Sequence, residues 1–354
     1  MRTLVVSDFH IGARDERARL EDPVAVAALR RAAEHADRLV LLGDVLELRQ
    51  GPLEHALAAA SRVLPELAAG LGPGREIVIV PGNHDHGLLA GWCGRRAVAG
   101  EPPALGLESP VDWHQGEPLA RLAELLGSGG AAVSARYPGI WLREDVYATH
   151  GHYLDRRTTV PTFERLSAGV MARLLHRPLA EIAAVEDYEA VLRPVYAWTY
   201  ATAQAAPDER HQHSSGRAWQ IIQDARGARR AAWTAALAGM TAALNAARLG
   251  PLKRDLSAVE FRRAGLRAFG EVLESLAAVC AYAIFGHTHR AGPLQGDDLA
   301  EWRAPTGTRL FNSGCWLEDL TFAGGAPDNP YRAGFAIELD DSGPPRLTNL
   351  LDER

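Results

Sequence analysis

The sequence predicts an α/β fold in which helices cover a mainly parallel sheet. Two observations support this prediction. Short runs of β-branched residues and leucine alternate with helical patterns over residues 1–80, and each run ends at polar residues next to glycine. Open α/β sheets bind ligands in the crevice beyond the carboxyl ends of their strands. We therefore expect a ligand site at that edge.

The first third of the chain supplies the strands and helices that establish this rhythm. Buried strands are predicted over residues 3–7, 38–42 and 76–80. A helix is expected over 22–36, where Asp22-Pro23 provides an N-cap and a first-turn proline, and another over 53–69, which stops at glycines. Strands joined by helices in this way indicate a parallel sheet.

The later elements are less regular. Residues 91–118 are rich in glycine and proline and predict a long loop. The other expected elements are a helix over 118–126, a hairpin of 139–142 with 146–149, and strands over 282–285, 334–339 and 346–350.

Residues 153–279 have a different character, because β-branched runs vanish and alanine, arginine and leucine dominate. We interpret them as a helical insertion between residues 1–152 and 280–354. The insertion carries 17 Lys and Arg against 13 Asp and Glu, whereas the rest of the chain is acidic. A stripe of apolar residues favours helix packing over a lipid groove. Its members are Trp219, Ile222, Trp233, Leu237, Met240 and Leu244.

Composition places the chain among ordinary globular proteins. It has 354 residues, of which 47% are hydrophobic and 23% charged, with a net charge of −6, so nothing overall indicates a nucleic-acid binder. Three scattered cysteines show neither a disulfide framework nor a zinc pattern. No signal peptide or membrane-spanning stretch is visible, and we expect a cytoplasmic protein.

Five polar clusters follow predicted strands. They are Asp8-x-His10, Gly43-Asp44, Gly82-Asn83-His84-Asp85, His150-Gly151-His152 and Gly286-His287-x-His289. Carboxylate, imidazole and amide oxygen form a mixed set that suits Mn, Fe or Zn better than Ca or Mg. Seven candidate ligands are too many for one tetrahedral zinc, whereas two metals that share a carboxylate would use them all.

Such a pair of metals has a specific chemistry. Two divalent ions ~3.5–4 Å apart bind a bridging water or hydroxide as nucleophile, lower its pKa toward ~7, and hold the oxygens of a phosphate. The leaving oxygen then needs a proton. A histidine that is not a ligand suits this task, because its unperturbed pKa is about 6.5.

In this order and spacing, the five clusters resemble the signature of calcineurin-like metallophosphoesterases. The resemblance covers residues 1–152 and 280–354, and the 153–279 block lies outside the motifs. It implies a four-layer α/β/β/α sandwich of two mixed sheets with the site at the strand ends. It also implies a hydrolase of phosphoric esters or anhydrides.

The resemblance assigns roles by position. It implies that Asp8, His10, Asp44 and His289 hold one metal, and that Asp44, Asn83, His150 and His287 hold the other. His84 would be the proton donor or phosphate stabiliser, and Asp85 would orient it. Mn²⁺ is the preferred ion, and Fe or Zn would also suit this ligand set.

The Gly-Asp-x-x-Glu form of the second cluster, which ends at Glu47, is similar to that of UDP-2,3-diacylglucosamine hydrolases. Those enzymes also carry a helical insertion that shields an acyl substrate. They have arginine where this chain has His84, and His-Gly-Asp where it has His150-Gly151-His152. The similarity suggests that residues 153–279 form a lid. For the substrate we expect a small-molecule or lipid-linked phosphate, such as a nucleotide-diphosphate conjugate.

Several other residues are candidates for supporting roles. We expect Glu47 to hold a ligand or a loop, and His152 either to support a ligand or to face the substrate. Arg156 and Arg157 are the basic residues most expected near the site, because they follow His152 closely. Solvent exposure is expected for the remaining histidines considered, which are His86, His114, His176, His211 and His213.

Two alternatives stay open. A nuclease or cyclic-nucleotide phosphodiesterase would use the same metals, and a continuous basic groove on the insertion would favour it. A protein-binding scaffold on the same fold is the non-enzyme alternative. Scaffolds of that kind lose metal ligands, whereas this chain has a suitable residue at every ligand position.

Overall fold

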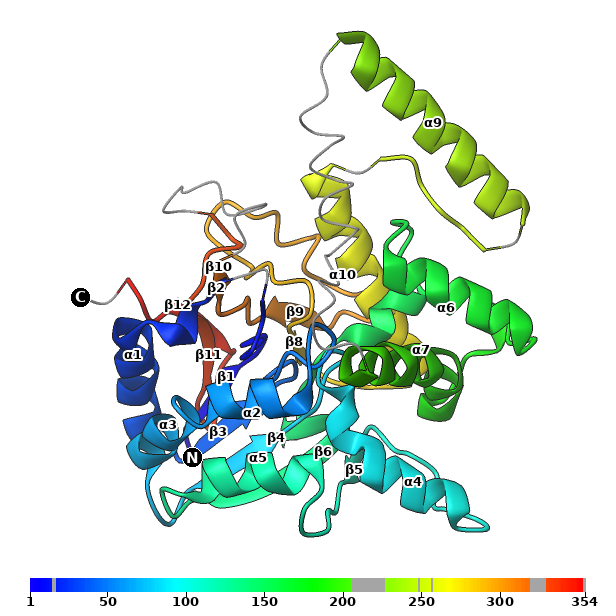
Figure 1. The fold of residues 1–354 in the computed structure, drawn as a ribbon. Coiled ribbons are helices and arrows are strands. Elements are labelled where there is room, and N and C mark those ends of the chain that lie inside the picture. The colour runs from blue at the N-terminus through cyan, green and yellow to red at the C-terminus, as the bar shows by residue number, and fades with distance from the viewer. Residues whose placement is uncertain (15–16, 206–226, 248, 256, 319–328, 353–354) are drawn as a thin grey trace.

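The computed structural model describes residues 1–354 except 15–16, 206–226, 248, 256, 319–328 and 353–354 (Figure 1). The strands are β1 (Thr3–Val6), β2 (Arg17–Ala18), β3 (Arg38–Leu41), β4 (Glu76–Ile79), β5 (Glu108–Pro110), β6 (Ala132–Arg143), β7 (Val146–Thr149), β8 (Tyr282–Phe285), β9 (Arg309–Asn312), β10 (Leu317–Glu318), β11 (Phe335–Leu339) and β12 (Arg346–Asn349). The helices are α1 (Pro23–Glu34), α2 (Leu53–Ala60), α3 (Leu64–Leu71), α4 (Ala90–Val98), α5 (Pro118–Gly127), α6 (Phe163–Leu174), α7 (Val185–Ala205), α9 (Gly227–Ala246) and α10 (Ala258–Ser275). This mixture confirms the predicted α/β fold.

Most strands belong to one path, in the order β12-β11-β1-β3-β4-β6-β7-β8-β9. Strand β6 is long enough to serve both halves of this path. Its residues 132–135 pair in parallel with β4, and its residues 139–143 pair antiparallel with β7. The two mixed sheets that the resemblance implied are therefore joined through β6.

The two halves pack face to face. Buried Val40 and Val78 from one half share a core with Ile140 and Ile284 from the other. Because side chains alternate between the faces of a strand, the neighbours Leu39, Leu41, Ile77 and Ile79 point the opposite way. They belong to a separate core with residues of the overlying helices.

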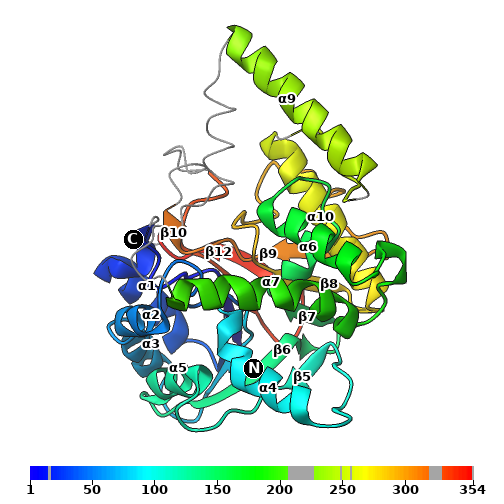
Figure 2. The ribbon, with the colours of Figure 1, turned by 45° about the vertical axis from the view of Figure 1, so that its right-hand side comes forward.

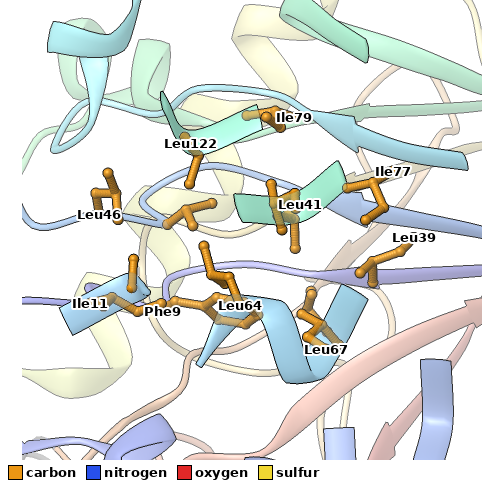
Figure 3. Packing of buried hydrophobic residues seen from close by; sticks show 14 of the residues in the cluster. Phe9, Ile11, Leu39, Leu41, Leu46, Leu64, Leu67, Ile77, Ile79 and Leu122 are labelled. Carbon is orange, nitrogen blue, oxygen red and sulfur yellow. The ribbon is translucent and has the colours of Figure 1, made fainter. Parts of the chain in front are cut away.

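Helices cover both outer faces and complete a four-layer α/β/β/α sandwich. Figure 3 shows Leu64, Leu67 and Leu122 of α3 and α5 packed against the outward strand residues of the first half. On the other side Phe269 of α10 stacks on Phe285 of β8, with ring centroids 4.2 Å apart. Helix α10 lies within the predicted insertion, so the outer layer of the sandwich extends into that region.

Helices α6 and α7 pack against each other. Tyr188, Val191 and Leu192 of α7 share a buried cluster with Ala168 and Ala172 of α6. Helix α9 extends away from the other elements in both views (Figures 1 and 2). Of the predicted apolar stripe, Met240 of this helix is exposed, whereas Trp219 and Ile222 lie outside the described residues. His211 and His213, whose exposure was predicted, also lie outside them.

Two local predictions are wrong. The single helix expected over 53–69 is divided into α2 and α3. Pro65 lies in the first turn of α3, where its missing N–H costs nothing, whereas inside one continuous helix it would break a hydrogen bond. The loop expected over 91–118 contains most of α4, which buries Trp92, and the short strand β5.

None of the described helices combines the length and the apolar character that crossing a bilayer requires.

Candidate metal centre

The predicted ligands meet at one edge of the sandwich. Asp8, Asp44 and Asn83 follow the parallel neighbours β1, β3 and β4, and His150 and His287 follow the parallel neighbours β7 and β8. His10 and His289 each lie two residues beyond a ligand of this edge. The structure thus brings together all seven residues, and most of them are almost completely buried.

The backbone is strained where it presents these side chains. Five of the seven residues have left-handed backbone, with φ between 46° and 64°: Asp8, His10, Asp44, His287 and His289. Such conformations are uncommon for residues other than glycine and persist where surrounding structure enforces them. At Gly82 a Cβ would collide with Asp44 and His150, so glycine is required there for the close approach.

One group of donor atoms comes from the first and last clusters. Asp8 Oδ1 lies 3.3 Å from His289 Nε2. His10 Nε2 lies 3.2 Å from the same nitrogen of His289 and 3.7 Å from Asp44 Oδ2. A carboxylate and two imidazoles therefore converge beside Asp44.

A second group lies on the other side of Asp44. His150 Nε2 is 3.1 Å from Asp44 Oδ2 and 3.1 Å from Asn83 Oδ1. His287 Nδ1 is 3.0 Å from the same Asn83 oxygen. The carboxylate of Asp44 thus adjoins both groups and is the group that two ions would share.

The other ring nitrogens show that these imidazoles suit metal binding. His10 Nδ1 donates to Glu47 Oε2 at 3.0 Å, His150 Nδ1 donates to the Leu42 carbonyl at 2.9 Å, and His287 Nε2 donates to Asp155 Oδ1 at 3.1 Å. In the neutral form of each ring, the nitrogen that faces the cluster therefore carries the lone pair. Metal-ligating histidines are usually held in this way. The residues present therefore fit divalent ions.

Charge within the cluster shifts its pKa values in the absence of ions. Burial alone would lower the pKa of His150, but the charge of Asp44 raises it to about 9. Burial likewise opposes the charged form of His10, and hydrogen bonds with Asp8 and Glu47 raise its pKa well above the ordinary value. The raised pKa values of both imidazoles therefore favour the charged form, with a proton on each ring nitrogen. A metal ion must displace the proton on the nitrogen that it binds.

We predict that metal affinity rises with pH. Ligation needs neutral imidazoles, so metal must displace protons as long as the pH is below the raised pKa values of His150 and His10. Each displaced proton changes the affinity about tenfold per pH unit, and we expect a rise of at least ~100-fold from about pH 6 to about pH 8. Titration with Mn²⁺ across this range measures it; an affinity independent of pH would contradict the proton displacement.

His84 is held beside this cluster by Glu47. Its Nδ1 donates to Glu47 Oε2 at 2.6 Å, and its backbone N–H donates to Asp44 Oδ1 at 2.8 Å. Burial lowers the pKa of His84, and the positive charge of Arg49, whose Nη1 lies 3.3 Å from His84 Nε2, lowers it further against the opposing effect of Glu47. Glu47 thus holds a ligand, His10, and a candidate catalytic residue at once.

Asp85 does not orient His84, and that prediction is wrong. Its two carboxylate oxygens accept the backbone N–H groups of Gly82 at 2.7 Å and Val45 at 2.8 Å. A buried carboxylate needs such donors: the bond from Gly82 closes the turn after β4, and the bond from Val45 ties this turn to the one after β3. Burial, followed by repulsion from Asp44, raises the pKa of Asp85 to about 6.

His152 is buried behind the metal centre. Its Nε2 lies 3.2 Å from the Tyr137 hydroxyl, and its ring centroid is 5.6 Å from that of His150. Its Nδ1 is buried and has no hydrogen-bond partner among the described residues, so both expected roles stay predictions. His86 is also buried, with Nε2 3.7 Å from Glu189, so its predicted exposure is wrong. His114 and His176 are exposed, as predicted.

Arg156 and Arg157 turn away from the metal ligands, contrary to the prediction. Arg157 donates to the Tyr188 hydroxyl and the Ile182 carbonyl, and Arg156 donates to the Arg177 carbonyl. These partners belong to the helical region. The 3₁₀ turn over His152–Arg156 directs the side chains there, which short sequence separation from His150 does not reveal.

Three residues of the site were not predicted. Asp155 binds His287, Arg49 lies beside His84, and Glu164 of α6 accepts from Arg49 Nη2 at 3.0 Å. The sequence gives a weak indication for two of them: Arg49 lies two residues after Glu47, and Asp155 lies five residues after His150. Glu164 carries none, since only the docking of α6 brings it to the site.

The comparison with known families agrees with this geometry. The family model described as Calcineurin-like phosphoesterase matches residues 1–206, which is more than half of the chain and includes the first four clusters. The fifth cluster lies beyond the matched residues, but His287 and His289 join the same site. No curated protein matches the chain in sequence. The chain belongs to the calcineurin-like phosphoesterase family.

Proposed function

We propose that the protein is a dinuclear metal-dependent hydrolase of phosphoric esters or anhydrides. The observation that carries this proposal is the position of Asp44, whose Oδ2 lies 3.7 Å from His10 Nε2 and 3.1 Å from His150 Nε2. One ion would be held by Asp8, His10, Asp44 and His289, and the other by Asp44, Asn83, His150 and His287. Mn²⁺ is our first choice for both.

The residues around the ions would bind and orient the substrate. When bound, two divalent ions would neutralise charge on a phosphate and lower the pKa of water toward ~7. Glu47 fixes the Nδ1–H of His84, so Nε2 of the protonated imidazole would give the proton to the leaving oxygen, whereas in the neutral ring the same nitrogen accepts from Arg49. Arg49 adds a positive charge beside this nitrogen.

The helical region would select the substrate. Glu164 of α6 reaches Arg49, so this region touches the rim of the metal centre directly. We propose that residues 153–257 form the cap, whereas α10 belongs to the sandwich with residues 1–152 and 280–354. A cap of this kind suits a small-molecule or lipid-linked phosphate, with nucleotide-diphosphate conjugates as the first class to try.

A substrate screen tests the function. Mn²⁺-loaded protein is incubated with phosphomonoesters, phosphodiesters and nucleotide-diphosphate conjugates. We expect hydrolysis of at least one class, loss of that activity with a chelator, and its return when Mn²⁺ is restored. Metal-loaded protein that hydrolyses none of the three classes would contradict the proposal and would favour a binding scaffold.

A further inference from the structure

Several buried hydrogen-bond donors near the start of α6 have no acceptor among the residues that the structure describes. They are Nη1 and Nη2 of Arg165, Nε of Arg156 and the hydroxyl of Thr159. Arg165 is 0% exposed and Arg156 is 5% exposed. All of these groups can donate a hydrogen bond, so the partner that they lack is an acceptor.

The local structure fixes this arrangement. Arg165 stands in the first turn of α6, which Thr162 caps by accepting the Arg165 N–H. Its Nε donates to the Thr158 carbonyl at 2.8 Å, so one edge of the guanidinium is held and the other two nitrogens remain unpaired. A Cβ added at Gly169, one turn along α6, would lie 3.2 Å from Nη1. Any larger side chain there would crowd the unpaired end of the guanidinium.

The charge of the two arginines is poorly compensated. Burial, followed by repulsion from Arg156, lowers the pKa of Arg165 to about 10, and Asp155 opposes this only in part. Asp155 does not neutralise the two arginines: its Oδ1 accepts from His287, and its Oδ2, although buried, has no hydrogen-bond partner among the described residues. Among the described residues, no carboxylate pairs with Nη1 or Nη2 of Arg165 or with Nε of Arg156. A buried charge without a partner is unfavourable, and natural proteins rarely retain one.

We propose that Arg156, Arg165 and Thr159 form a binding site for a small oxyanion of the phosphate class, distinct from the proposed metal ligands. A tetrahedral oxyanion presents several acceptor oxygens, and guanidinium groups bind such oxygens through paired N–H groups. The complete burial of Arg165 favours a free anion over the phosphate of a large substrate.

Thermal unfolding of the full chain tests this site without the metal centre. The protein is treated with a chelator, and its Tm is measured as inorganic phosphate replaces chloride at constant ionic strength. At a concentration roughly a hundredfold above its Kd, phosphate should raise the Tm of the unaltered chain by about 5 °C. Arg165→Met should lose this shift and, without phosphate, should melt no lower than the unaltered chain, because it removes an unpaired charge.

Two further variants control for the loss of a buried arginine and for a failure of Arg165→Met to fold. Arg38 is also buried, but its guanidinium donates to Thr3 Oγ1 and the Leu142 carbonyl. Arg38→Met should therefore melt lower and keep the full phosphate shift. If Arg165→Met does not fold, Arg156→Met provides the same comparison, with at least half of the shift expected to disappear.

The Tm shifts caused by phosphate decide whether the anion site exists. An equal phosphate shift in the unaltered chain and Arg165→Met, or no shift in the unaltered chain, would overturn the site. Phenyl phosphate serves as a second ligand: no shift supports the free anion, and an Arg165-dependent shift supports the same site with an ester as its source. Since no metal is present, failure here leaves the proposed hydrolase function untouched.

Discussion

Asp44→Asn is expected to lower kcat/KM at least ~1000-fold, equivalent to about 4 kcal/mol of transition-state stabilisation, and to weaken metal binding at both positions. The reason is that Asp44 Oδ2 adjoins both donor groups, so removing its charge affects two ions at once. Asparagine keeps the oxygen that accepts the His84 backbone N–H, so the turn after β4 should keep its conformation. Steady-state hydrolysis and bound Mn²⁺ are both measured.

Asp145→Asn is the matched control for this change. Asp145 lies in the β6–β7 turn, pairs with Arg143 and is far less buried than Asp44. We expect its activity and metal content to equal those of the unaltered chain. Full activity in Asp44→Asn would refute the shared carboxylate, and loss of only one ion would show that Asp44 serves a single position.

His84→Ala is expected to lower kcat by ~100- to 10,000-fold while the metal content stays unchanged. His84, His10 and Asp44 lie close enough together to bind one metal ion, but the Nδ1 of His84 already donates to Glu47. In proton transfer or phosphate binding, the imidazole of His84 acts without binding a metal ion. Its removal should therefore leave the metal content unchanged. Metal analysis of the purified variant therefore accompanies the kinetics.

His114→Ala provides the control, because His114 is an exposed histidine away from the site. It should match the unaltered chain in both measurements. If His84→Ala instead loses an ion, His84 is a metal ligand and the proton must come from another group. Unchanged kcat would remove His84 from the mechanism altogether.

The sequence predicted which residues gather at one edge of the sheet because each candidate ligand lies close to the end of a strand. Runs such as residues 76–80 specify a buried strand by their apolar pattern, and β4 occupies Glu76–Ile79. The parallel order then fixes where the strands end, so Asp8, Asp44 and Asn83 must approach one another. This part of the site depends on short-range patterns and simple sheet geometry.

The surrounding contacts were harder to predict because they depend on side-chain direction and on the docking of distant helices. Asp85 is adjacent to His84 in sequence, yet its carboxylate turns back to two backbone N–H groups. Glu47 contacts His84 across 37 positions, and Glu164 reaches Arg49 from α6. No periodicity in the sequence encodes such pairings, and only the folded chain shows them.

The number of metal ions per chain tests the central claim most directly. Purified protein is stripped with a chelator, dialysed against Mn²⁺ and assayed for metal by mass spectrometry, with Asp44→Asn treated in parallel. The dinuclear assignment predicts two ions per unaltered chain and loss of both, or a marked weakening of both, in the variant. A single ion in the unaltered chain, unaffected by Asp44→Asn, would contradict it.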